Sequence, residues 1–235
     1  MLNKDETARL QDGIRAVMSI PFIDDIEDFV WEAIFSYARG IPIVDPLKKT
    51  RSKRLFDVVD IATERGWSCK ALQWAISPQV EFELVIQRAD IFKKATSLGF
   101  DTLNTSSSPD ELGRALLRHW LGKVAGDSAL QRVREKRVSI LLKSADRSRF
   151  AYHEAEIREY KPGHLKWKWT DKTKTGLQGI RTEDGFVSYR WYPNQKQLFE
   201  RFQLAKNPHI FEVRIERMPP RVVVQCLLAL LRGNA

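Results

Sequence analysis

Cysteine and histidine are scarce in this chain, and their placement argues against the common zinc sites. The two cysteines, Cys69 and Cys226, are far apart in the sequence, and the four histidines form no closely spaced pair. Structural zinc sites draw their ligands from short, regular Cys and His spacings. We therefore expect no zinc and two free thiols, as in a reducing cytoplasm.

Long apolar runs are also missing. No stretch approaches the roughly 20 apolar residues that a membrane-spanning helix needs. The first residues, Met1 to Glu6, are polar and acidic and lack the apolar segment of a signal peptide. We therefore expect no membrane segment.

What the chain does contain is typical of a soluble globular protein. Its 235 residues are 43% hydrophobic and 29% charged, enough to bury one core, or a core with a subdomain. We expect one domain over residues 1–235, with a core at about 24–160 and a β-rich, basic C-terminal part at about 161–235.

The surplus of positive charge lies entirely in the C-terminal part. Residues 1–100 hold 14 Lys+Arg against 15 Asp+Glu, whereas residues 101–235 hold 25 against 15. Within residues 161–201 the basic residues are interleaved with seven aromatic ones, a pattern that suits phosphate neutralisation and base stacking. The competing interpretation is a sheet with its aromatics inside and its lysines in solvent, and the alternation in residues 165–169 agrees with that.

The periodicity predicts an α/β (α+β) order with a mixed sheet flanked by helices. We expect helices at 24–39, 79–96, 109–124 and after Pro219–Pro220, and strands at 55–60, 66–72, 137–143, 149–157, 165–170, 185–192 and 209–216. Ser108 with Pro109 and Glu111 marks one helix start clearly, since it forms a capping box with proline at the first helical position.

The chemistry-bearing feature is the predicted hairpin 55–72. Its first strand carries Asp57 and its second carries Ser68 and Lys70 on one face, because side chains alternate across a strand. An acid and a lysine so placed suit a divalent cation beside a phosphodiester, and they equally suit a plain salt bridge. Asp60 competes with Asp57, because the alternation assumes regular strands.

A helix, an acid-bearing hairpin and a second helix resemble the PD-(D/E)XK nuclease superfamily. Asp57 matches the first acid of the motif and Lys70 its lysine, while Phe56 replaces the usual proline and Ser68 the second acid. One restriction-endonuclease branch has SxK here and supplies the missing carboxylate from the following helix. On that pattern Glu83 is the relocated acid, with Glu81 in reserve.

The resemblance, which covers about residues 24–160, implies a Mg²⁺-dependent endonuclease that cuts double-stranded DNA at specific sequences, as type II restriction enzymes do. It implies that Asp57 and Glu83 bind Mg²⁺, that Lys70 stabilises the developing negative charge, that Ser68 orients a water and that Glu32 is an outer acid. It further implies a homodimer in a bacterial or archaeal cytoplasm, with a cognate DNA methyltransferase as a potential partner in the system.

Candidate DNA contacts follow from residue chemistry. The basic loop that ends in Lys53 and Arg54 suits phosphates, and Gln73 and Arg88 lie near the hairpin in sequence. A second group, Gln195 and Lys196, follows an aromatic run.

Two alternatives remain open. Ser68 favours a degenerate site, in a nucleic-acid-binding subunit of a defence or repair complex. A different class is an interaction protein whose basic face binds an acidic partner. Stability separates the classes: a nuclease without Asp57 should be as stable as the wild type or more so, whereas a salt-bridged core should be weakened.

Overall fold

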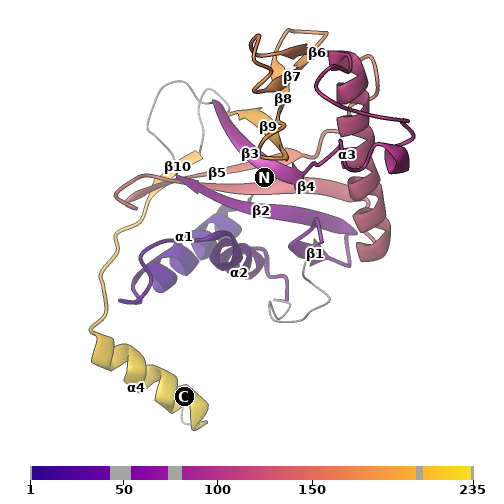
Figure 1. The fold of residues 1–235 in the computed structure, drawn as a ribbon. Coiled ribbons are helices and arrows are strands. Elements are labelled where there is room, and N and C mark those ends of the chain that lie inside the picture. Colours follow the sequence, from indigo (N-terminus) through magenta and orange to yellow (C-terminus); the bar gives the residue numbers. More distant parts are fainter. Residues whose placement is uncertain (1, 43–53, 74–80, 205–208, 234–235) are drawn as a thin grey trace. The chain divides into compact units, whose positions relative to one another are not determined.

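The computed structural model describes residues 2–42, 54–73, 81–204 and 209–233, and it has an α+β fold made of two compact units (Figure 1). Unit 1 comprises 1–77, 131–157 and 207–235, and unit 2 comprises 78–130 and 158–206. The chain therefore passes from unit 1 to unit 2 twice, because residues 78–130 and 158–206 belong to unit 2 and the segments before, between and after them belong to unit 1. None of the described helices is long and apolar enough to cross a membrane.

Unit 1 contains one mixed sheet in the order β1-β2-β4-β5-β10, where β2 and β4 are parallel and the other neighbours antiparallel. Its elements are α1 (Lys4–Met18), α2 (Asp28–Arg39), β1 (Val58–Asp60), β2 (Arg65–Gln73), β4 (Glu135–Lys143), β5 (Arg149–Glu156), β10 (His209–Glu212) and α4 (Pro220–Leu231). Helices α1 and α2 lie against one face of this sheet (Figure 1).

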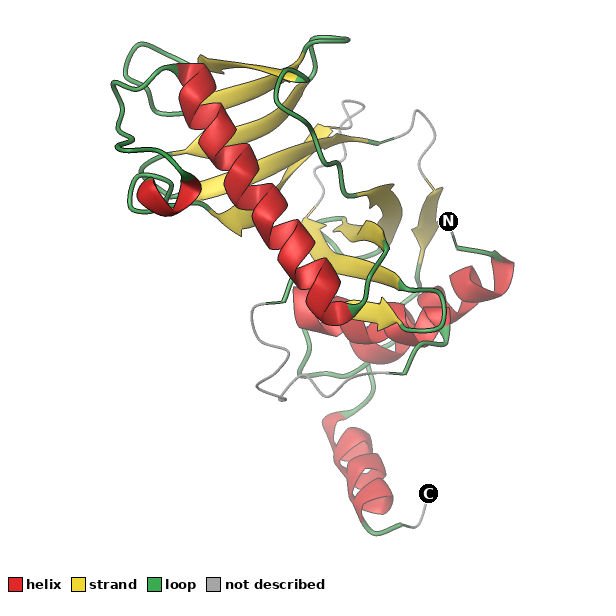
Figure 2. Cartoon of the chain, turned by 90° about the vertical axis from the view of Figure 1, so that its right-hand side faces the viewer, coloured by secondary structure: helices red, strands yellow, loops and turns green. Residues whose placement is uncertain are grey.

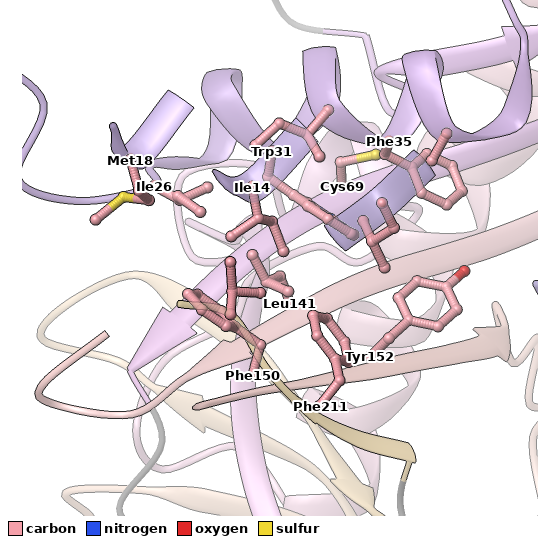
Figure 3. Packing of buried hydrophobic residues seen from close by; sticks show 14 of the residues in the cluster. Ile14, Met18, Ile26, Trp31, Phe35, Cys69, Leu141, Phe150, Tyr152 and Phe211 are labelled. Atoms are coloured by element: carbon pink, nitrogen blue, oxygen red, sulfur yellow. The ribbon is translucent and has the colours of Figure 1, made fainter. Parts of the chain in front are cut away.

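The core of unit 1 fills the space between those helices and the sheet. Apolar residues that recur along α1 and α2 pack in one cluster with Trp67, Cys69 and Leu141 of the central strands, and Figure 3 shows Cys69 and Leu141 among them. Trp31 and Phe35 of α2 pack against each other with ring centroids 5.6 Å apart, and the Phe35 ring contacts Trp67 at 5.4 Å. Burial of these large side chains contributes most of the stabilisation of unit 1.

A buried carboxylate, that of Glu154 on β5, connects helix α2 to the sheet of unit 1. The Glu154 side chain is 1% exposed and forms an ion pair with Arg39 of α2 at 2.6 Å. It also accepts hydrogen bonds from the Trp67 indole at 2.8 Å and the Tyr152 hydroxyl at 2.9 Å. Burial alone would raise the pKa of Glu154, but these donors outweigh it and hold the pKa below its usual value.

We expect Glu154→Gln to destabilise the protein by about 3 kcal/mol, because it removes the nearer of two carboxylates that neutralise the buried Arg39 guanidinium, the other being Glu6 at 3.3 Å. Urea denaturation measures the change. Arg15→Ala, which breaks the exposed pair with Asp12, is the control and should cost less than about 1 kcal/mol. Equal losses in the two variants would contradict the assignment.

Unit 2 contains a five-stranded antiparallel sheet in the order β3-β9-β8-β7-β6. Its elements are β3 (Glu81–Arg88), the short 3₁₀ helix η2 (Thr96–Leu98), α3 (Pro109–Gln131), β6 (Leu165–Trp169), β7 (Leu177–Arg181), β8 (Val187–Tyr192) and β9 (Gln197–Gln203). The long helix α3 runs across one face of this sheet (Figure 2).

A glycine lets α3 approach the sheet closely. A Cβ atom at Gly113 would lie 2.3 Å from the Trp167 ring, and one at Gly179 would lie 2.9 Å from the same ring. Trp167 is therefore clamped between the helix and β7, and its ring stacks on Tyr189 at 6.5 Å. The Trp167 ring is therefore buried and cannot stack on a nucleic-acid base.

Unit 2 also buries a carboxyl group, but the pKa of this one is raised, whereas that of Glu154 is lowered. Glu200 of β9 is 2% exposed and lies between Leu84 of β3 and Tyr189 of β8. Its Oε1 atom has no hydrogen-bond partner among the described residues. Burial raises the pKa of Glu200 to about 8, against the opposing influence of Arg158.

We predict that the stability of unit 2 falls as the pH rises from about 5 to 8. The folded state holds a proton on Glu200 that the unfolded chain releases near pH 4.5, so unfolding becomes easier throughout that window. Over this pH range the free energy of unfolding should fall by about 4 kcal/mol. Glu200→Gln should flatten the dependence and stabilise the protein at pH 8, as measured by urea denaturation at several pH values. Parallel pH profiles for both proteins would refute this prediction.

Most predicted elements are confirmed. Helix α3 begins at Pro109, where the Ser108 hydroxyl accepts a hydrogen bond from the Glu111 N–H, the apolar run 137–143 lies within β4, and α4 follows Pro219, although it buries only Val223. The helix predicted at 79–96 is wrong, because residues 81–88 form β3 and a turn follows. Four of the described elements were missed: α1, η2, β7 and β9.

Candidate active site

The predicted hairpin forms, and Asp57 and Lys70 lie at its open side. Strand β1 pairs antiparallel with only the first residues of β2, from Arg65 to Trp67. Strand β2 continues to Gln73 with β4 on its other edge, and no strand that the structure describes pairs with this remaining length. The N–H and C=O groups there need other partners.

Side chains supply those partners. The Asp57 Oδ2 atom accepts a hydrogen bond of 2.8 Å from the Cys69 N–H. The Asp28 Oδ1 atom accepts one of the same length from the Ala71 N–H. Between them the Lys70 Nζ atom donates to the Cys69 carbonyl at 2.9 Å and lies 3.2 Å from Asp28 Oδ2. A carboxylate, an ammonium and a carboxylate thus alternate along the free edge of β2.

The two anchoring N–H groups are separated by two residues of strand, which is about 6.6 Å. Asp57 comes from the residue before β1, Asp28 from the first turn of α2 and Lys70 from β2 itself. Three separate segments therefore bring the charged groups to one strand edge. Asp28 has no counterpart in the sequence-based site, and its only signal was its place four residues before Glu32 on a helix.

Lys70 keeps its positive charge at neutral pH. Burial would lower the pKa of Lys70, but the carboxylates of Asp57 and Asp28 outweigh this and hold the pKa above its usual value. An ammonium with a raised pKa stays protonated at neutral pH, so it can stabilise negative charge but cannot act as a general base.

Cys69 faces the other way and is inert. It is fully buried in the core of unit 1, and burial, with Asp57 and Glu32 nearby, raises the pKa of its thiol far above the usual value. Ser68 is half-buried and lies on the face of β2 opposite to Cys69. It therefore shares a face with Lys70, as the alternation predicted. Glu32 lies one helical turn after Asp28, so both acids share a face of α2.

Asp60 is no longer a competitor for the role of Asp57. Its carboxylate accepts hydrogen bonds from the Ala62 N–H at 3.0 Å and from the Thr63 hydroxyl at 2.6 Å. The Thr63 hydroxyl is the main cause that lowers the pKa of Asp60. Asp60 therefore closes the turn between β1 and β2.

Glu83 does not lie on a helix, which corrects the prediction of a relocated acid on a helix after Lys70. It belongs to β3 in unit 2, where its Oε1 atom is 2.7 Å from Arg190 and 3.1 Å from Arg201. The reserve acid Glu81, which also lies on β3, forms an ion pair with Arg201 of β9. Residues 81–88 form a strand because their pattern is compatible with a two-residue repeat, and Phe82 and Leu84 pack on one face.

The predicted DNA contacts divide between the units. Arg54 and Gln73 belong to unit 1, whereas Arg88, Gln195 and Lys196 belong to unit 2. Lys53 lies outside the described residues. Gln73, Arg88 and Gln195 are exposed, and Lys196 forms an ion pair of 2.7 Å with Asp90 that holds the β8–β9 turn.

The expected aromatic surface is largely internal. Trp167, Tyr189 and Trp191 are buried, whereas Lys166 and Lys168 are exposed. The interpretation of a sheet with its aromatics inside is therefore confirmed for these residues.

No group of three or more His, Cys, Asp or Glu side chains arranged to hold a metal ion is found in the described part of the chain. The hairpin site thus presents two anchored carboxylates and an ammonium. Comparisons with protein-family models, curated proteins and solved structures gave no match.

The hydrogen bond to Cys69 changes what we expect from removing Asp57. Asp57→Ala leaves the Cys69 N–H without this partner and should destabilise the protein by about 1–2 kcal/mol. Asp57→Asn keeps an acceptor oxygen and should lose less. Urea denaturation of both variants tests this, and an alanine variant as stable as the wild type would mean that repulsion between acids dominates.

Proposed function

We propose that the protein is a nuclease that hydrolyses phosphodiester bonds in double-stranded DNA with Mg²⁺, at the free edge of β2. The observation that carries the proposal is the convergence of Asp57, Lys70 and Asp28 from three segments on one strand edge. A strand edge that needed only hydrogen bonds could use neutral side chains, yet this one gathers three charges.

The position of Lys70 supports an electrostatic role. Its ammonium is flanked by two carboxylates, and its side chain is 28% exposed, so a phosphate can reach it. A fixed positive charge there would stabilise the additional negative charge of a phosphodiester under attack. Its raised pKa keeps that charge in place at neutral pH.

The donor set fits Mg²⁺ in chemical type. Mg²⁺ prefers oxygen ligands and is often held by one or two carboxylates, with waters and substrate phosphates completing its shell. Asp57 and Asp28 would hold the ion, with Glu32 as the outer acid. When bound, Mg²⁺ supplies Lewis-acid polarisation of a phosphate oxygen and a water of lowered pKa.

The surplus of basic residues supports nucleic acid as the substrate, because 39 Lys+Arg face 30 Asp+Glu in the chain. Sequence specificity of the restriction type, a homodimer, a bacterial or archaeal cytoplasmic location and a cognate methyltransferase rest on the superfamily resemblance, and they form part of this proposal.

The test is cleavage of mixed plasmid and phage DNA with Mg²⁺ or EDTA. We expect Mg²⁺-dependent fragments from the wild type and at least a hundredfold slower cleavage from Lys70→Ala and Asp57→Asn. Asp60→Asn is the matched control, since it changes an acid of the same hairpin that only closes the turn, and it should cleave normally. Thermal denaturation of each variant separates lost chemistry from lost folding.

A second candidate is a nucleic-acid-binding subunit with a degenerate site. It is favoured by the lack of a three-ligand metal group among the described residues and by Ser68 at the position of the second acid. This candidate predicts that DNA is retarded on a gel equally with Mg²⁺ or EDTA, equally by wild type and Asp57→Asn, and is never cut. A protein that neither cuts nor binds DNA would leave the acidic-partner alternative.

A further inference from the structure

The sheet of unit 2 has two chemically different faces. The residues that pair across it as Trp167, Gly179 and Tyr189 face α3 and are buried. Because side chains alternate along each strand, the neighbouring residues point to the opposite face. We call this second side the open face, and none of the α3 contacts described above involves it.

The open face is rich in cations. Lys166 and Lys168 of the edge strand β6 are exposed, and neither forms an ion pair with a residue that the structure describes. Arg190 of β8 and Arg201 of β9 are 23% and 18% exposed. Among the described strand residues of this face, two acids of β3, Glu81 and Glu83, oppose these four cations.

Those two acids fix the arginines and balance their charge, so the net positive charge of the open face comes from the two lysines. Glu83 lies between the two guanidinium groups, 2.7 Å from Arg190 and 3.1 Å from Arg201, and Glu81 also pairs with Arg201. Arginines held in this way lose less side-chain freedom when they bind a phosphate. The two lysines at the other edge keep their charge unopposed.

Aromatic rings lie among the cations on the same face. Tyr192 and Phe199 are half-buried, and their rings meet at right angles with centroids 5.3 Å apart. The Tyr192 hydroxyl accepts a hydrogen bond from Arg190. Unlike Trp167 and Tyr189, these two rings are not covered by α3.

We infer that the open face binds single-stranded nucleic acid, which is a binding activity beyond the proposed cleavage. Cations flanking half-exposed rings on a sheet suit an unpaired strand, whose phosphates meet the lysines and arginines while a base stacks on an aromatic ring. A duplex keeps its bases stacked inside, so it gains nothing from Tyr192 and Phe199. Charge complementarity and the half-exposed rings therefore point to the same partner.

The test is fluorescence anisotropy of the full-length protein with labelled oligo(dT), over a range of salt concentrations. Lys166→Ala combined with Lys168→Ala should weaken binding at least fivefold and reduce the salt slope by about 1.4, the amount for two phosphate contacts on a single strand. Tyr192→Leu should also weaken binding about fivefold, with the salt slope unchanged.

The matched control is Lys93→Ala combined with Arg114→Ala, which removes the same charge from exposed residues outside the open face. It should bind oligo(dT) within about twofold of the wild type. If the Lys166/Lys168 variant binds like the wild type, or if the control loses as much affinity, the inference is overturned. The same holds if an unlabelled duplex competes better than an unlabelled single strand.

Cleavage assays keep this result separate from the proposed function. Weakened oligo(dT) binding by the lysine variant of a protein that never cuts would uphold the open face and refute the nuclease. Cleavage that depends on Lys70, together with oligo(dT) binding that does not depend on Lys166 and Lys168, would support the nuclease and refute binding at the open face.

Discussion

The arrangement of the hairpin site depends on one constraint: β2 has nine residues and its partner β1 only three. The backbone groups left over must find hydrogen-bond partners. Asp57 and Asp28 satisfy two N–H groups, and Lys70 satisfies the carbonyl between them. The same three groups therefore stabilise the strand edge and form the proposed site, so changes to them affect folding and chemistry together.

Two buried glutamates show how strongly surroundings decide the state of a charge. Glu154 has an arginine, an indole and a hydroxyl directed at it, and its pKa is lowered. Glu200 has one oxygen without a partner among the described residues, and its pKa is raised to about 8. Glu154 is thus a charged group in the core of unit 1, whereas Glu200 in unit 2 is mostly protonated at neutral pH.

The local patterns that were predicted correctly are those whose partners lie close in sequence or whose period is unambiguous. The helix start at Ser108, the apolar strand 137–143 and the alternation in 165–169 are examples. The segment 81–88 was assigned to a helix because Leu84 and the residues around it fit a helical spacing almost as well as an alternating one. Pairing with β9, more than a hundred residues later, decides for the strand. Strands β7 and β9 were missed because they are short and mix polar with apolar residues.

The sequence by itself determined that Asp57 and Lys70 would lie near one another on the hairpin, because a hairpin brings near neighbours together and side chains alternate along its strands. It also determined that the lysines of β6 would face solvent. Only the tertiary structure could show that Asp28 joins the site and that Glu83 belongs to another sheet. Both outcomes rest on contacts between segments 40 to 120 residues apart, as in Lys70–Asp28 and Glu81–Arg201. Such contacts depend on how whole elements pack, which no local pattern of residues encodes.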